Sequence, residues 1–83
     1  MRIRHDPEAD AVMVELAEGI YHESRELDVD RLVDYTRDGT PLRVELLGVS
    51  GGVDLAGVPH AEEIGTELRR LGFRVVEHQA AAS

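Results

Sequence analysis

Residues 32–47, LVDYTRDGTPLRVELL, form the stretch with the clearest local structure in the chain. Apolar and polar residues alternate on both sides of Asp38-Gly39, which is the period-two pattern of half-buried strands. Gly39 suits the positive φ of a tight hairpin turn, and Pro41, which lacks an N–H, is expected at a strand start. The stretch therefore predicts a β-hairpin, and it contains no chemical motif.

Three further extended segments are expected before this hairpin. Residues 3–6 and 11–16 lie on either side of the turn DPEAD at 6–10, and we expect them to form a first hairpin. Residues 20–27 predict another strand. The segment 28–30, Asp-Val-Asp, interrupts it because Asp is depleted in strands.

A helix is predicted over residues 59–71. Pro59 suits its first turn, Gly72 suits its end, and its charges run from acidic to basic, as the helix dipole favours. Its apolar stripe consists of Ala61, Ile64, Leu68 and Leu71. We expect this stripe to cover Val12, Val14, Val44 and Leu46. Residues 73–76 predict a short final strand.

The expected fold class is α+β: a small antiparallel β-meander of four to five strands with one C-terminal helix packed on one face. The 83 residues predict a single domain over 1–77 and a disordered tail over 78–83. Hydrophobic residues make up 42% of the chain and aromatic residues 4%, so the core must be aliphatic. A core this small gains from oligomerisation, so we expect a homodimer.

The chain has 17 acidic and 9 basic residues, a formal net charge of −8. Binding to phosphates needs clustered Lys and Arg, so neither nucleic acid nor an anionic membrane is an expected partner, whereas a basic protein is compatible with this charge. The chain has no cysteine, which rules out disulfides and thiolate zinc sites. Its first residues contain no apolar run like that of a signal peptide, so a cytoplasmic location is expected.

Motifs in the first fifty residues resemble a known family of small prokaryotic proteins, the domain of unknown function 2283. These motifs are the turn Asp6-Pro7-Glu8-Ala9-Asp10, the segment Ser24-Arg25-Glu26-Leu27, the hairpin from Asp34-Tyr35 to Gly39, and the strand Val44-Glu45-Leu46-Leu47. The resemblance covers residues 1–50 and leaves the helix in a C-terminal extension. His5, Thr36 and Arg43 differ from the Tyr, Asp and Gly of the family pattern.

What the resemblance implies about function is limited. The family has no established activity. Its members are often encoded beside small toxin-like proteins, which implies an antitoxin-like or partner-binding role by analogy.

The carboxylates of Asp6, Glu8 and Asp10 alternate in a way that suggests a cation site. An EF-hand loop starting at Asp6 needs Gly at its sixth position and Glu at its twelfth, and these positions hold Ala11 and Ala17. We therefore expect Asp6 to cap the turn through its side chain.

His5, Asp6 and His22 are the weak candidates for a metal site. The four histidines of the chain have no i, i+4 spacing, and His5 and His22 meet only if their strands pair. Neither a metal site nor a cofactor is expected. A small-molecule or metal-binding protein that uses these three residues is the alternative hypothesis.

Catalytic residues are not expected. Glu15, Asp34 and Glu45 lie on predicted strands and could share a face, but cross-strand ion pairs with Arg31 or Arg43 explain them more simply. The chain has no motif of a nucleophile or of a phosphate-binding loop. An enzyme is therefore not expected, and a weak hydrolase is the third hypothesis.

Four acids within eight residues form the best candidate for a partner-binding surface: Glu23, Glu26, Asp28 and Asp30. On a strand edge, these charges either steer a basic partner or prevent unwanted strand addition, and the sequence leaves both readings open. The leading hypothesis is a homodimeric protein-interaction module with an acidic face.

Overall fold

The computed structural model describes residues 1–76 and contains the hairpin predicted over 32–47. β4 (Arg31–Tyr35) and β5 (Pro41–Leu47) pair antiparallel. Between them Gly39 has a φ of 89° and donates its N–H to the carbonyl of Thr36 at 3.1 Å. The tail expected over 78–83 lies outside the described residues.

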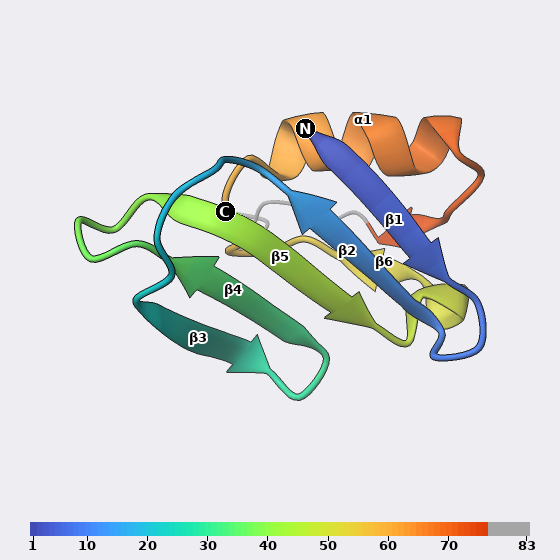
Figure 1. The fold of residues 1–83 in the computed structure, drawn as a ribbon. Coiled ribbons are helices and arrows are strands. Elements are labelled where there is room, and N and C mark those ends of the chain that lie inside the picture. Colours follow the sequence, from blue (N-terminus) through green and yellow to red (C-terminus); the bar gives the residue numbers. More distant parts are fainter. Residues whose placement is uncertain (77–83) are drawn as a thin grey trace, which may run out of the picture.

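Five strands form an antiparallel sheet in the order β1-β2-β5-β4-β3 (Figure 1). β1 (Arg2–Asp6) and β2 (Ala11–Glu15) form the predicted first hairpin, and β2 also pairs with β5. β3 (Glu23–Asp28) pairs with β4 and lies at the edge opposite β1. The predicted antiparallel sheet is confirmed.

The connection from β2 to β3 departs from a simple meander. Because β2 pairs with β5, residues 16–22 must run past the ends of β5 and β4 to reach the far edge (Figure 1). At Gly19 the crossing is so close that a Cβ would lie 3.0 Å from the side chain of Leu42. The third strand therefore begins at Glu23 and not at Ile20, because the residues before Glu23 make the crossing.

One face of the sheet forms the core together with the helix. The four strand residues expected beneath the helix are each at most 1% exposed: Val12, Val14, Val44 and Leu46. α1 (Ala61–Arg70) contributes Ile64 and Leu68, both fully buried, to the same cluster. The prediction of one helix packed on one face of the sheet is thus confirmed.

The helix is shorter than the predicted span of 59–71. His60 lies just before its first residue with a left-handed φ of 56°, so the helical conformation does not extend back to Pro59. At the other end Leu71 is 49% exposed, and its assignment to the buried stripe was wrong. The chain turns at Gly72, with a φ of 96°, and Phe73 packs against the core instead.

The remaining C-terminal elements complete the core. A 3₁₀ turn, η1 (Val49–Gly51), leads into β6 (Val53–Asp54), which pairs in parallel with the short final strand β7 (Val75–Val76). This part of the chain adds four buried side chains to the core: Val49, Val53, Leu55 and Val58. Over residues 1–76, no helix is both long enough and apolar enough to cross a membrane.

Candidate functional site

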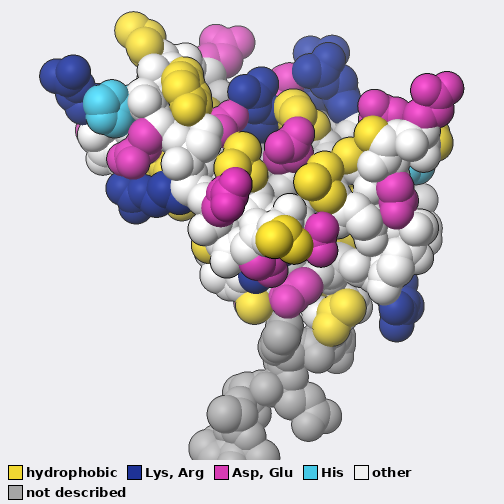
Figure 2. All heavy atoms as spheres, turned by 90° about the horizontal axis from the view of Figure 1, so that it is seen from below, with side chains coloured by type: hydrophobic (Ala, Val, Ile, Leu, Met, Phe, Trp, Pro, Cys, Tyr) yellow, Lys and Arg dark blue, Asp and Glu magenta, His cyan; other side chains and the backbone are white. Residues whose placement is uncertain are grey.

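The acidic run lies along an open strand edge. Within the described residues β3 pairs with β4 alone, and five of its six residues are exposed. We call "the acidic edge" the acidic and apolar side chains of β3 and of the turn that follows it: Glu23, Glu26, Leu27, Asp28, Val29 and Asp30. Figure 2 views the molecule from the β3 side of Figure 1 and shows acidic and hydrophobic side chains interspersed.

Two acids of this edge are paired with neighbouring arginines. Glu23 accepts a hydrogen bond from Arg25 Nη2 at 3.1 Å, and this carboxylate raises the pKa of Arg25. Asp28 Oδ2 accepts a hydrogen bond from Arg31 Nε at 3.0 Å. Half of the acidic charge is therefore compensated locally.

The other two acids, Glu26 and Asp30, have no ion pair within residues 1–76. Beside them Leu27 is 39% exposed and Val29 is 87% exposed. The acidic edge thus combines two acidic side chains that are in no ion pair within residues 1–76 with exposed apolar side chains.

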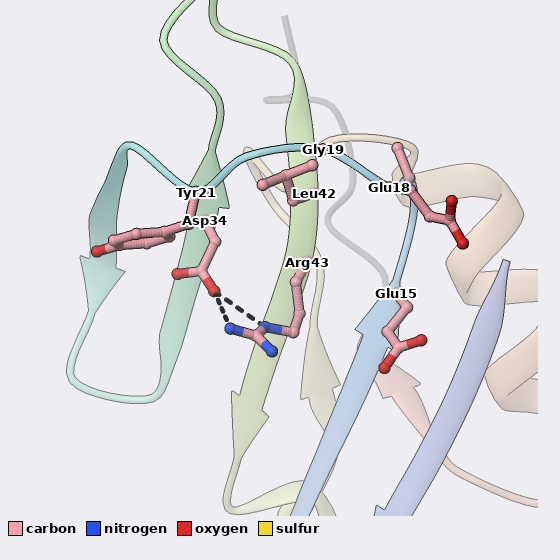
Figure 3. A pocket seen from close by; sticks show the side chains of 8 residues that line it. Glu15, Glu18, Gly19, Tyr21, Asp34, Leu42 and Arg43 are labelled. Atoms are coloured by element: carbon pink, nitrogen blue, oxygen red, sulfur yellow. Dashed lines mark hydrogen bonds and ion pairs between the residues drawn. The ribbon is translucent and has the colours of Figure 1, made fainter.

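A buried carboxylate lies on the sheet face opposite the helix. Asp34 is 5% exposed, and its Oδ2 accepts hydrogen bonds from Nε and Nη2 of Arg43 at 2.9 and 2.7 Å (Figure 3). Its Oδ1 accepts a hydrogen bond from Ser24 Oγ at 2.6 Å, and Ser24 Oγ lies 2.8 Å from the Tyr21 hydroxyl. Both oxygens of the buried carboxylate are therefore satisfied.

This network borders a cleft of about 360 Å³ that also contains Glu15 and Glu18. Both glutamates point away from the Asp34–Arg43 pair (Figure 3), and Glu15 accepts a hydrogen bond from Arg4 at 3.2 Å. The predicted pairing of strand carboxylates with Arg43 is confirmed for Asp34. The cleft thus contains the Asp34–Arg43 ion pair on one side and the two glutamates on the other.

The structure separates the weak metal candidates. His5 lies on β1, where its ring contacts the ring of Phe73 at a centroid distance of 4.9 Å. His22 comes just before β3, at the opposite edge of the sheet. Asp6 accepts the N–H of Ala9 at 3.2 Å, as predicted for a turn cap. Within residues 1–76, no three His, Asp or Glu side chains come together as a metal site.

Asp10 has a role that sequence reasoning missed. Its φ is 51°, and its carboxylate accepts hydrogen bonds from the N–H and the Oγ of Ser50 at 3.0 and 2.7 Å. This contact joins the turn of the first hairpin to η1, which leads into the C-terminal extension. The available signal was weak: an Asp in a turn tolerates the left-handed conformation.

Comparison with known families gives one match, to a family model that covers residues 2–50, more than half of the chain. The chain belongs to the DUF2283 family. The family is described as a protein of unknown function, so membership assigns no activity. No curated protein and no solved structure matches the chain.

The matched region of this DUF2283 protein ends in η1, so β6, α1 and β7 come after it. Arg31 fastens this extension to the sheet: Nη1 donates hydrogen bonds to the carbonyls of Asp54, at 3.2 Å, and Ala56. The Arg31 side chain is only 12% exposed. The same guanidinium binds Asp28, so one residue connects the acidic edge with the extension.

Proposed function

We propose that this DUF2283 protein is a protein-interaction module that binds a basic partner through the acidic edge. The observation that supports this function most strongly is the juxtaposition of uncompensated Glu26 and exposed Leu27 on the open strand β3 with exposed Val29 and uncompensated Asp30 in the turn that follows it. One form of this proposed function is that of an antitoxin, which binds a basic partner and neutralises it.

The alternative is that the charges only prevent strand addition. Charged side chains and β-bulges on an edge strand hinder the pairing of another strand with that edge. β3 carries such charges, and its pairing with β4 has a register shift between Glu26 and Asp28. However, protection is weakened by large apolar side chains at the same edge, and Val29 is 87% exposed. In an interface such side chains add apolar area that is removed from water, and nearby charges steer the encounter.

The sign of the charge selects the class of partner. The chain has a net charge of −8, and the two uncompensated groups at the edge are both acidic. They repel nucleic acid and attract Lys and Arg side chains. We therefore favour a basic protein as the partner, bound in a manner that weakens as salt screens the charges.

The test is parallel affinity capture from the protein's own cells with three tagged forms. These are the wild type, the edge variant Glu26→Lys/Asp30→Lys, and the control Glu8→Lys/Glu62→Lys, which makes the same charge change at exposed acids elsewhere. A basic protein recovered by the wild type and the control, but lost with the edge variant and in high salt, supports the proposal. Equal recovery by all three forms overturns it.

A further inference from the structure

A second hollow lies where the β2–β3 connection passes the β4–β5 turn. Its volume is about 690 Å³, and its lining comes from both segments: Glu18, Ile20, Tyr21, His22, Thr36, Arg37, Asp38 and Thr40. Ile20 is 87% exposed and Tyr21 is 56% exposed. We call this hollow, with its rim, "the crossing groove".

The turn that forms one wall of the crossing groove is held by its own hydrogen bonds. Thr36 and Thr40 both donate their hydroxyl groups to the carboxylate of Asp38, and the N–H of Thr36 donates to the carbonyl of Thr40 at 3.0 Å. The other wall is tied to β4, because the N–H of His22 donates to the carbonyl of Tyr35 at 2.8 Å. The groove is therefore shaped before any partner binds, which lowers the entropic cost of association.

The charges of the groove are of both signs. Glu18 and Arg37 are exposed and neither has an ion pair within residues 1–76. Arg37 disfavours a basic partner, and Glu18 with Asp38 disfavours a nucleic acid. Glu18 and Arg37 thus provide one acid and one base that are in no ion pair, beside the exposed apolar side chains of Ile20 and Tyr21, and such a pair can be satisfied twice across a two-fold axis.

We propose that the crossing groove binds a second copy of this chain in a two-fold dimer. In this dimer Glu18 of each protomer pairs with Arg37 of the partner subunit, and the exposed Ile20 and Tyr21 side chains pack around the axis. Burial of Ile20 removes from water one of the most exposed large apolar side chains in residues 1–76. The small core of an 83-residue chain provides an additional reason for association.

This dimer is independent of the proposed partner. The lining of the crossing groove includes none of the acidic-edge residues, so in the proposed dimer each protomer keeps its own acidic edge outside the groove. Two basic segments on one partner would then bind with an avidity that a monomer does not provide.

The test is the mass of the untagged protein in solution, measured by sedimentation equilibrium over a range of concentrations. The wild type is expected to be a dimer, and Ile20→Asp is expected to raise the dimer dissociation constant by about tenfold or more. Val29→Asp is the matched control, because Val29 is equally exposed at 87% but lies on the acidic edge. This control is expected to remain dimeric.

Charge reversal tests the geometry of the interface. Glu18→Arg and Arg37→Glu are each expected to weaken the dimer, and the two changes together are expected to restore it. A monomeric wild type, an unchanged Ile20→Asp dimer, or a failure of the double reversal to rescue overturns the proposal. None of these results affects capture of a partner by the acidic edge, so the two proposals fail separately.

Discussion

Asp34 on β4 lies directly opposite Arg43 on β5, and one carboxylate oxygen of Asp34 accepts both hydrogen bonds of the Arg43 guanidinium, at 2.7 and 2.9 Å. Asp34 is almost fully buried, whereas the side chain of Arg43 is 45% exposed. The pair thus lies at the boundary between the sheet and the solvent, and Ser24 from β3 binds the second oxygen.

Replacement of Asp34 by Ala is expected to lower the free energy of unfolding by about 1–3 kcal/mol, because Arg43 and Ser24 lose a buried acceptor. Arg43→Ala should also destabilise, and the double variant should cost less than the sum of the single ones. Urea unfolding measures these energies. The control is Arg4→Ala, which removes an exposed pair and should cost less than about 0.5 kcal/mol. Equal costs for Arg4→Ala and Asp34→Ala would show that the buried network adds nothing.

Arg31 is predicted to hold the extension on the sheet. Arg31→Ala removes its hydrogen bonds to the carbonyls of Asp54 and Ala56, so amide hydrogen exchange over residues 53–58 should become faster. The control is Arg70→Ala, which removes an exposed pair on α1 and should leave exchange over 53–58 unchanged. Unchanged exchange in Arg31→Ala would mean that apolar contacts alone hold this segment.

The helix boundaries make a prediction about packing. Ile64 is fully buried and Leu71 is 49% exposed. Ile64→Ala should therefore lower the free energy of unfolding by about 2–5 kcal/mol, and Leu71→Ala by less than about 1 kcal/mol. Thermal or denaturant unfolding distinguishes the two. Similar costs at both positions would place Leu71 in the core and contradict the observed end of α1.

Asp38 gives a pH prediction. Hydrogen bonds from Thr36 and then Thr40 hold the pKa of Asp38 below its ordinary value of 3.8. Because the folded pKa is the lower one, the stabilising contribution of this carboxylate is present above the unfolded pKa and is lost as the pH falls through the folded pKa. In an NMR titration, Thr36→Val should move the pKa of Asp38 up towards 3.8. Thr66→Val, whose hydroxyl bonds the Glu62 carbonyl on α1, should leave it in place.

Local patterns in the sequence predicted the elements well. Alternation on either side of Asp38-Gly39 is sufficient for the hairpin, because a positive φ at Gly39 and period-two burial are both local properties. The apolar spacing of Ile64 and Leu68 likewise identified the buried face of α1. The ends of the helix were less accurate, since they depend on the backbone at His60 and Gly72.

Long-range relationships were not accessible from the sequence. The sequence suggested an ion pair of Asp34 with Arg43, but the burial of Asp34 and its contact with Ser24 depend on strand pairing that forms only in the folded sheet. The strand order also depends on pairing of β2 with β5, which no local pattern encodes. The charges of the acidic edge were visible in the sequence, but their position on an outer strand follows from that order.

The central claim is that a partner binds at the acidic edge, and hydrogen exchange tests it most directly. Exchange is measured across the chain for the free protein and for its complex with the basic protein recovered by capture. The account predicts slower exchange over residues 23–30 in the complex and unchanged exchange in β1, the opposite edge. Protection confined to β1 or α1, with 23–30 unchanged, would contradict the claim.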